Sequence, residues 1–325
     1  MSSPSIQWYP GHIAKAERSL KEQLKRVDVV LEIRDARIPL ATDHPDVDSW
    51  IGKKARVLVL NRVDMISAEA RQAWQNWFKA QGQTVYFTNA KQGKGVQTLL
   101  RAAQAAGKAM NARRKSRGMK PRPVRAVVIG FPNVGKSALI NRLLKRKVVV
   151  SERRAGVTRQ LRWVRISDEI ELLDAPGIIP LKLNDQAAAL KLAICDDIGN
   201  AGYDTQRVAA AFVDLLTALD AQAGGGNYGS AIAARYGSPL VAVTGETYTG
   251  ETYLSVLAQR HSGDLERAAH QLLNDFRKGN LGSLVLELPP PETFQDTLQD
   301  VPPEMPPEMP PETPPDGTAT APSVA

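Results

Sequence analysis

The stretch AVVIGFPNVGKS, Ala126 to Ser137, decides the fold. Its second part, from Gly130 onward, matches GxxxxGK[ST], the pattern of a loop that wraps phosphate groups. An apolar run precedes this loop and the helix-forming segment SALINRLL follows it, which is the strand–loop–helix context that the pattern requires. Glycines let backbone N–H groups turn toward phosphates, and a helix N-terminus favours negative charge. The stretch therefore predicts an α/β domain that binds a nucleotide.

The side chains of this loop predict separate roles in the site. We expect Lys136 to reach the β- and γ-phosphates as a binding and catalytic group, and Ser137 to bind Mg²⁺. The predicted phosphate contacts are Gly130, Pro132, Asn133, Val134, Gly135, Lys136, Ser137, Ala138 and, outside the loop, Gly177.

Two shorter motifs that follow complete a magnesium site. ELLDAPG ends an apolar run with Asp174, which can hold Mg²⁺ through water, and with Gly177, whose amide can sense the γ-phosphate. The segment AGVT lies between the two motifs and places Thr158 where it can join the magnesium shell when the γ-phosphate is present. We therefore expect Thr158 and Gly177 to be catalytic.

A further motif predicts the choice of base. NRVD, Asn61 to Asp64, directly follows the apolar run VLVL. The Asp64 carboxylate can accept from guanine N1 and N2, and adenine would leave that carboxylate unpaired. TNAK, Thr88 to Lys91, follows the next apolar run and offers the Ala90 amide to guanine O6. The predicted guanine contacts are Asn61, Arg62, Asp64, Asn89 and Ala90.

The order of these motifs is unusual, because NRVD and TNAK precede the phosphate loop. A circular permutation explains the order without a new sheet, since chain termini that lie close together permit it. Apolar runs that suit buried strands alternate with helical stretches, which predicts a mixed, mostly parallel sheet with helices on both faces. The expected strands are 27–33, 57–60, 84–87, 126–129, 161–166 and 170–173, and the expected helices are 13–26, 68–81 and 136–144.

The chain divides into three parts. We expect a circularly permuted P-loop GTPase domain over 1–180, with an exposed basic connector at 107–125. After Pro180 the strand signal fades, and 184–199, 205–221 and 264–277 predict helices, so a small all-helical domain is expected over 181–288. Residues 289–325 hold twelve of the 22 prolines. This composition predicts a disordered Pro/Glu-rich tail.

Charge is unevenly distributed between these parts. The chain has a net charge of +8, and the tail holds seven acids and no base, so the residues up to Leu288 carry +15. A strongly basic body favours a polyanionic partner such as RNA, although charge alone equally fits a role in solubility. The candidate RNA-binding residues lie in the connector: Arg113, Arg114, Lys115, Arg117 and Lys120.

Composition excludes several other classes of protein. Cys195 is the only cysteine, which excludes disulfides and a cysteine-cluster zinc site. No uncharged apolar run approaches the roughly 18 residues of a membrane helix, and no signal peptide precedes the body. We therefore expect a cytoplasmic protein with no membrane partner.

At these residues the sequence resembles the circularly permuted GTPases, and specifically the ribosome biogenesis GTPase A family. The resemblance also includes IQWYPGHIAKA at 6–16, DARIP at 35–39 and LNDFRKGNLG at 273–282, and it covers about 6–288. It implies GTP hydrolysis stimulated by ribosomal particles, late in assembly of the large ribosomal subunit. The implied partners are GTP and GDP, the subunit precursor, its rRNA and ribosomal proteins, without DNA. The chain departs from the family pattern at Arg62, Ala155 and Ala138.

The resemblance also implies two further roles. Ile178 stands where ordinary GTPases carry a glutamine that orients the attacking water. His12 of WYPGH is then expected to be catalytic, because a neutral imidazole can accept a hydrogen bond from water. Asn133 sits where related GTPases place a ligand for K⁺, so K⁺ joins Mg²⁺ among the expected cofactors.

The residues leave alternatives open. The chain can be a GTPase that couples hydrolysis to release from a ribosomal precursor. It can instead be a nucleotide-dependent RNA-binding switch, or a scaffold, in which hydrolysis is incidental. Turnover stimulated by ribosomal particles separates the first hypothesis from the others.

Overall fold

The computed structural model describes residues 6, 13–144, 162–174, 185–199, 202–222, 227–238, 240 and 247–291. Contacts along the chain group Met1–Pro289 into one unit and Pro290–Ala325 into a second. Residues 292–325, which include almost all of the predicted tail, lie outside the described residues.

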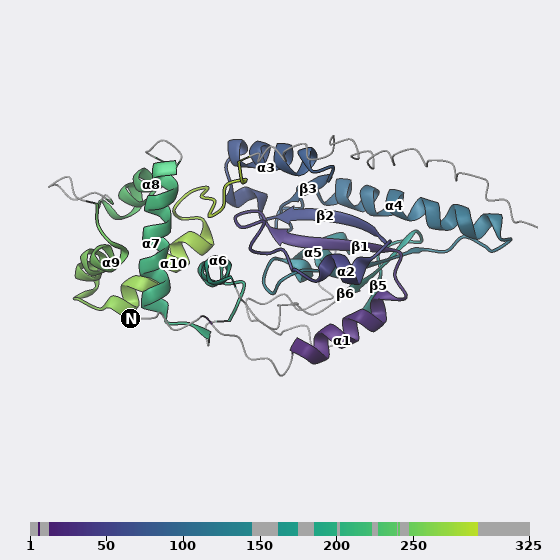
Figure 1. The fold of residues 1–325 in the computed structure, drawn as a ribbon, viewed down its shortest axis with the longest axis horizontal. Helices are drawn as coiled ribbons and strands as arrows, with labels where there is room; N and C mark the ends of the chain where they lie inside the picture. The colour runs from purple at the N-terminus through teal and green to yellow at the C-terminus, as the bar shows by residue number, and fades with distance from the viewer. Residues whose placement is uncertain are drawn as a thin grey trace, which may run out of the picture. The chain divides into compact units, whose positions relative to one another are not determined.

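A six-stranded sheet forms the centre of the first half of the chain (Figure 1). Its strands lie in the order β3-β2-β1-β4-β6-β5, and every neighbouring pair is parallel except β5 and β6. The strands are β1 (Val29–Asp35), β2 (Ala55–Asn61), β3 (Val85–Thr88), β4 (Val124–Ile129), β5 (Arg162–Arg165) and β6 (Ile170–Asp174). The predicted mixed, mostly parallel sheet is therefore confirmed.

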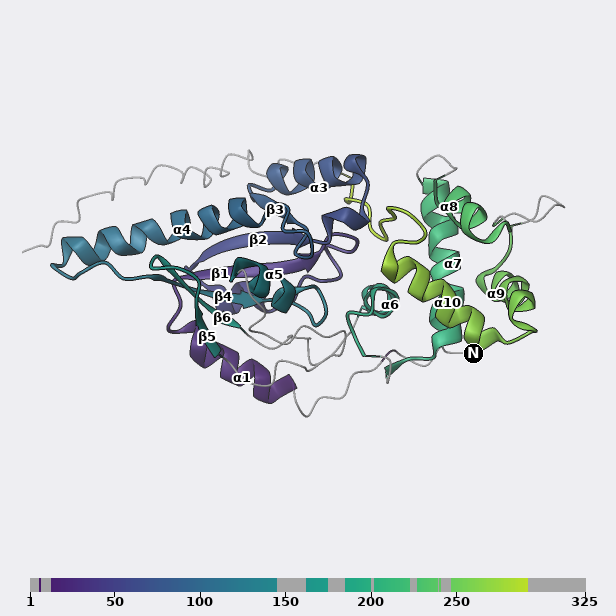
Figure 2. The same ribbon diagram turned by 180° about the vertical axis from the view of Figure 1, so that it is seen from behind.

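Both faces of this sheet are covered by helices (Figures 1 and 2). Side chains alternate along β1, so Val30 packs in one apolar cluster and Leu31 in another. The Val30 cluster contains buried side chains of α1 (Ile13–Leu24) and α2 (Val47–Ile51). The Leu31 cluster contains those of α3 (Ala68–Ala80), α4 (Val96–Ser116) and α5 (Lys136–Leu143). A short 3₁₀ turn, η1 (Val63–Met65), follows β2.

The predicted basic connector at 107–125 was wrong over its first half. Helix α4 continues to Ser116, and β4 begins at Val124, which leaves only 117–123 as a connection. Alanine, lysine and arginine are good helix formers, and basic side chains in a last turn favour the helix dipole. Gly107 faces inward, since a Cβ there would lie 2.2 Å from a methyl group of Val124.

The second half of the chain is helical in its described residues. The elements are α6 (Gln186–Cys195), α7 (Thr205–Gln222), α8 (Asn227–Tyr236), α9 (Gly250–Ala258), η3 (Gln259–His261) and α10 (Leu265–Lys278). Helices α8, α9 and α10 all pack against α7. Helices α8 and α9 were not predicted. The helices predicted at 184–199, 205–221 and 264–277 correspond to α6, α7 and α10.

Close approaches hold these helices together. Gly250 at the start of α9 lies against α7, where a Cβ would be 1.9 Å from the Ala210 carbonyl oxygen. The Phe212 and Phe276 rings join α7 to α10, with ring centroids 4.9 Å apart. Side chains of α6 to α10 belong to the same continuous core as the α3–α5 face of the sheet. The predicted boundary at 180 lies outside the described residues, so the division into two domains stays a prediction.

A helix that crosses a bilayer must be both long and apolar along its length. None of the described helices meets these two requirements.

Candidate nucleotide-binding site

The phosphate loop joins β4 to α5 and takes backbone conformations that depend on glycine. Gly130 has φ 147° and Gly135 has φ 101°, both in the region that side chains disfavour. A Cβ on Gly130 would also lie 2.2 Å from the Ile33 carbonyl oxygen of β1. Asn133 is left-handed as well, with φ 57°. The loop is therefore closely fitted against the sheet beneath it.

Lys136 lies inside this loop and is buried. Its Nζ donates to the carbonyl oxygens of Gly130 and Phe131, at 3.2 and 2.6 Å. The next two residues, Ser137 and Ala138, are both half-buried in the first turn of α5. The loop thus places one ammonium group and a helix N-terminus together, which is an arrangement suited to phosphate.

Asn61 is the hub between the predicted base motifs and the phosphate loop. Its Nδ2 donates to the Val134 carbonyl oxygen at 2.8 Å. Its Oδ1 accepts from Thr88 Oγ1 and from the Ala90 amide, both at 3.1 Å. A Cβ on Gly135 would lie 2.2 Å from the same Nδ2. The buried amide of Asn61 therefore ties NRVD, TNAK and the phosphate loop into one structure.

The other predicted base contacts surround this hub. Asp64 is exposed in η1. The Ala90 amide, expected to face guanine O6, donates to Asn61 in this structure, and the Ala90 carbonyl accepts from Arg142 Nε at 3.2 Å. Asn89 is buried, and its Nδ2 has no hydrogen-bond partner among the described residues. Guanine contacts by these residues stay predictions.

Arg62 connects the base motif to the phosphate loop by a second route. Its backbone is left-handed, and its guanidinium donates to the Asn133 carbonyl oxygen. The same guanidinium forms an ion pair with Asp35 at 3.1 Å and lies 3.8 Å from Asp197. The Asn133 side chain donates in turn to the Asp196 carbonyl oxygen at 2.5 Å. Residues that follow α6 therefore lie directly against the phosphate loop.

Asp35 and Arg37, of the DARIP segment, form a buried ion pair beneath Arg62. Arg37 donates from Nε and Nη2 to the two Asp35 oxygens, at 3.0 and 2.7 Å. Burial alone would raise the pKa of Asp35, but the charges of Arg37 and Arg62 hold it below its usual value. Arg37 also reaches the helical residues, with Nη2 3.4 Å from the Cys195 carbonyl oxygen and the guanidinium 5.1 Å from the Phe276 ring.

Asp197 differs from these paired groups. It is fully buried, and neither carboxylate oxygen has a hydrogen-bond partner among the described residues. Burial and the nearby Asp35 charge raise the pKa of Asp197 to about 8. Burial also raises the pKa of Cys195, whose thiol lies in the same interior region. Among the described residues, the region around Asp197 thus holds buried polar atoms that lack hydrogen-bond partners.

Several predicted catalytic and metal-binding groups fall outside the described residues: His12, Thr158 and Gly177. The backbone of Asp174 ends β6 and is registered with Val128 of β4, two residues before the phosphate loop. The Asp174 side chain is not among those described. Within the described part of the chain, no three His, Cys, Asp or Glu side chains gather as a metal site.

The candidate RNA-binding residues lie at the end of α4 and just beyond it. Arg113, Lys115, Arg117 and Lys120 are exposed, and Arg114 is half-buried. Arg114 Nε donates to the Lys120 carbonyl oxygen at 3.1 Å, which folds the connection back on the helix. These charges, here called the basic surface, therefore lie close together in the chain, at the exposed end of α4 and the connection that follows it.

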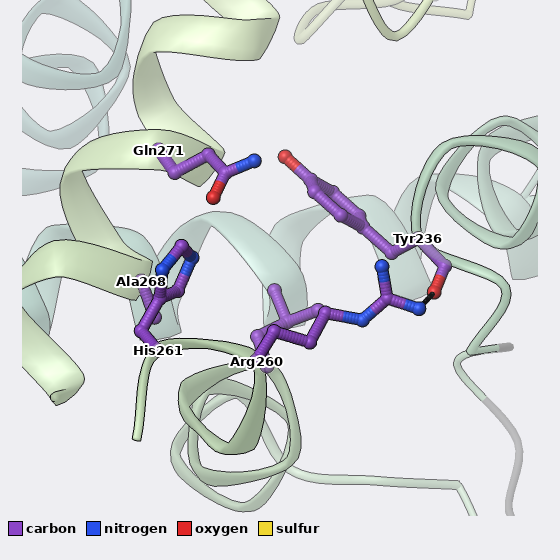
Figure 3. Close-up of a pocket in the computed structure, with 6 residues that line it drawn as sticks. Tyr236, Arg260, His261, Ala268 and Gln271 are labelled. Atoms are coloured by element: carbon purple, nitrogen blue, oxygen red, sulfur yellow. Dashed lines mark hydrogen bonds between the residues drawn. The ribbon is translucent and has the colours of Figure 1, made fainter. Parts of the chain in front are cut away.

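A small pocket lies elsewhere, between α8, α9, η3 and α10 (Figure 3). Its lining residues are Tyr236, Leu257, Arg260, His261, Ala268 and Gln271. The Arg260 guanidinium donates across it to the Tyr236 carbonyl oxygen. None of the predicted nucleotide contacts lines this pocket.

Sequence reasoning missed the buried charges around Arg62. Asp35 and Arg37 were noted only as part of the DARIP resemblance, and Asp196, Asp197 and Arg142 not at all. Asp35 and Asp197 are brought together by tertiary packing from distant parts of the chain. The unusual Arg62 in place of lysine was the one available signal that a carboxylate lies nearby.

Comparison with known proteins bears directly on this site. A family model described as 50S ribosome-binding GTPase matches residues 125–217. Proteins described as ribosome biogenesis GTPase A from Bacillus pumilus and Bacillus cereus are 38% and 40% identical, over 63% of this chain and 73% and 69% of theirs. A crystal structure of GNP-bound YlqF from T. maritima matches with a TM-score of 0.57 and 25% identity, over 85% of this chain and 99% of that chain. The phosphate loop, the base motifs and the sheet that carries them agree with these likenesses, and the chain belongs to the ribosome biogenesis GTPase A family.

Proposed function

We propose that this chain binds GTP and GDP, hydrolyses GTP, and acts as an assembly factor in late maturation of the large ribosomal subunit. Its turnover is slow alone and is stimulated by ribosomal particles. It works in the cytoplasm, and its partners are the subunit precursor, rRNA and ribosomal proteins.

The Asn61 hub is the observation that carries this proposal. One buried amide bonds the phosphate loop at Val134 and the second base motif at Thr88 and Ala90. This coupling fixes the distance between the Asp64 loop and Lys136, so that one nucleotide can be held by its base and its phosphates together. The exposed Asp64 carboxylate then selects guanine.

The donor set around the loop fits Mg²⁺, which prefers oxygen ligands. Ser137 lies in the first turn of α5, and Asp174 ends the strand beside β4, at the same edge of the sheet. We assign Ser137, Thr158 and Asp174 to the ion, which neutralises phosphate charge when bound. Lys136 neutralises the β- and γ-phosphates, and the Gly177 amide senses the γ-phosphate. K⁺ near Asn133 is a further part of the proposal.

Water activation is assigned to His12. The position after DAPG is Ile178, which has no hydrogen-bonding side chain, so the attacking water needs a partner from elsewhere. A neutral imidazole can accept its proton. Replacing His12 by alanine should lower the stimulated kcat tenfold or more while GTP affinity stays within a few-fold.

RNA contact is assigned to the basic end of α4 and to a helical domain over 181–288, with 289–325 as a disordered tail. The exposed side chains of Arg113, Lys115, Arg117 and Lys120 can each meet a phosphate. A GTPase domain over 1–180 then supplies the nucleotide switch.

A GTPase assay with and without large-subunit particles tests the proposal. We expect GTP turnover to rise by at least tenfold when particles are added, and Lys136→Ala to abolish the increase. Equal affinity for ATP and GTP would refute the assignment of the base site. Turnover that particles leave unchanged, together with nucleotide-dependent RNA binding, would favour a switch or scaffold instead.

A further inference from the structure

The turn that ends α6 lies directly against the phosphate loop. Asp196 caps the helix in the left-handed conformation, with φ 64°. Its carbonyl oxygen accepts from the Asn133 side chain at 2.5 Å. The next residue, Asp197, is buried in the protein interior, beside Arg62.

The Asp197 side chain is expected to lower the stability of the fold at this position. Its side chain is fully buried, and both oxygens lack hydrogen-bond partners among the described residues. An unpaired buried carboxyl group destabilises a fold, whether it is ionised or protonated. The buried Arg37 is already committed to Asp35 through two hydrogen bonds from its side chain.

Among the described residues, Asp197 forms its ion pair with Arg62. Arg62 Nη2 lies 3.8 Å from Asp197 and donates to the Asn133 carbonyl oxygen of the phosphate loop. Its Nη1 lies 3.1 Å from Asp35. The planar fork of arginine can serve these groups at once, whereas a lysine ammonium is a single point of charge. Arg62 is therefore held between two carboxylates, one from the sheet and one from the helical half.

We propose that Asp197 is a positioning residue for the nucleotide site, which acts through Arg62 to hold the Asn133 segment of the phosphate loop. The proposal rests on the proposed function, because it assigns a residue of the helical half to the same guanine-nucleotide site. Loss of the Asp197 carboxylate leaves Arg62 with Asp35 alone, and Asp35 already pairs with Arg37. The guanidinium then shifts toward Asp35, and its hold on Asn133 weakens.

This role predicts two effects of opposite sign for Asp197→Asn. The side chain keeps its shape but loses the buried carboxyl group, so thermal stability should stay unchanged or rise. Affinity for GDP and for a non-hydrolysable GTP analogue should fall about tenfold, because Arg62 no longer fixes the phosphate loop. A residue with a merely structural role would lower stability and affinity together.

Titration of a fluorescent GDP into the full chain at about pH 8.5, where the Asp197 carboxylate is ionised, measures both effects beside thermal unfolding. An affinity for the variant within twofold of wild type would overturn the proposal. Wild-type protein that binds no guanine nucleotide would instead refute the proposed function, so the two failures are distinguishable.

A double-mutant cycle shows whether Asp197 acts through Arg62. In an Arg62→Met background, Asp197→Asn should change GDP affinity by less than twofold, since the link is already broken. Effects that multiply in the double variant would mean that Asp197 acts by another route, and would also overturn the proposal.

Glu287→Gln provides the matched control. Glu287 is another buried acid of the helical half, and its oxygens accept from the Leu40 and Ala41 amides at 2.7 and 3.0 Å. No hydrogen bond or ion pair joins it to Arg62 among the described residues. The control should lower stability and leave GDP affinity within twofold, the reverse of the result expected for Asp197→Asn. A tenfold loss of affinity in this control as well would show a general loosening of the helical half and would count against Asp197.

The pH dependence supplies an independent readout. Among the described residues, the charged and titratable groups that act on Asp197 include Asp35, Arg37, Arg62, Asp196 and Cys195. The pKa of Asp197 lies at about 8, so its carboxylate forms as pH rises toward that value. The difference in GDP affinity between wild type and Asp197→Asn should therefore widen from about pH 6.5 to about pH 8.5. A difference that stays constant over this interval would contradict the role of the ionised carboxylate.

Discussion

Two buried polar clusters flank the phosphate loop, and they differ in how well their groups are paired. In the first, both side-chain amide atoms of Asn61 have partners, which join three loops at the sheet edge. Around Asp197, both carboxylate oxygens and Arg37 Nη1 have no hydrogen-bond partner among the described residues. The paired groups around Asn61 suit a rigid support for the nucleotide. The groups around Asp197 are able to change hydrogen-bond partners.

This difference in pairing should affect stability in opposite directions in the two clusters. A satisfied network strengthens a fold, whereas a partly satisfied one weakens it. Variants in the Asn61 cluster should therefore lower both stability and nucleotide affinity, while variants at Asp197 should separate the two quantities. Four measurements can sharpen or break this comparison.

The largest effect is expected for Gly135→Ala in the Asn61 cluster. Its Cβ would lie 2.2 Å from Asn61 Nδ2, on a backbone with φ 101°. The hub would have to move, so we expect a loss of about 3 kcal/mol in unfolding free energy and at least a hundredfold loss of GDP affinity. Urea unfolding and nucleotide titration measure these changes.

Gly82→Ala is the matched control for this variant. Gly82 also has a positive φ, 69°, but a Cβ there meets nothing within 4 Å. Its cost should be about 1 kcal/mol, from backbone strain alone, with GDP affinity unchanged. Equal losses in the two variants would mean that the contact with Asn61 is unimportant.

Asn61→Ala should have the next largest effect. The change leaves the Val134 carbonyl and the Ala90 amide without their buried partner. We expect a loss of about 2 kcal/mol in unfolding free energy, together with about a tenfold loss of GDP affinity. Asn76→Ala removes an exposed amide that accepts from Gln72 and should cost less than about 0.5 kcal/mol. An Asn61→Ala protein as stable as the wild type would show that Asn61 does not hold the surrounding loops in place.

The dependence of stability on pH tests the Asp197 cluster. The pKa of Asp197 is raised from 3.8 to about 8 in the fold, so the folded state binds a proton that the unfolded state has released between these values. Stability should therefore fall as pH rises from about 4 to about 8. Asp197→Asn should reduce that fall by at least about 1 kcal/mol in urea unfolding at several pH values.

Other buried acids do not obscure this test. Burial also raises the pKa of Glu287 and Asp43, but both remain in the variant, so the difference from wild type isolates Asp197. The lowered pKa of Asp35 acts in the opposite direction and at lower pH. Identical slopes in wild type and variant would show that Asp197 does not titrate in this range.

The smallest effect on stability is expected at the basic end of α4, which belongs to neither cluster. Replacing Arg113, Arg114 and Lys115 by glutamine should change unfolding free energy by less than about 1 kcal/mol. Arg113 and Lys115 are exposed, and the half-buried Arg114 loses one hydrogen bond, to the Lys120 carbonyl oxygen. The salt dependence of ribosome binding should fall by up to about three units of slope, one for each phosphate that the surface no longer neutralises. The same change at three exposed lysines elsewhere controls for net charge: Lys25, Lys53 and Lys79. An unchanged slope would show that the basic surface is only a solvated helix end and does not contact RNA phosphates.

The central strands β1, β2 and β4 were predictable because they are mostly buried and read as nearly continuous apolar runs. The expected strand at 126–129 became Val124–Ile129, and the run at 57–60 became Ala55–Asn61. The end of α4 was missed because basic residues serve a helix and a linker equally well. Helix α8 was missed because the glycines before it suggested a loop.

The candidate site also has a part that could be predicted from the sequence and a part that could not. The Asn61 cluster was predicted in outline, because loops at the carboxyl ends of neighbouring parallel strands must meet. The pairing of Arg62 with Asp35 and Asp197 could not be predicted, since it depends on where α6 docks, and no local pattern encodes that. A charge that is buried by tertiary packing looks, in a sequence, like any surface charge.

The extended segment after α10 has a mechanical consequence for the helical half. The Leu286 amide donates to the Arg37 carbonyl at 2.9 Å, and Glu287 binds the amides of Leu40 and Ala41. The end of α6 is fastened to the same short loop through Arg37. The chain between these two points is thus attached to the loop at both of its ends. If one attachment breaks, the other keeps the separated groups at high local concentration, so that the broken contact can form again.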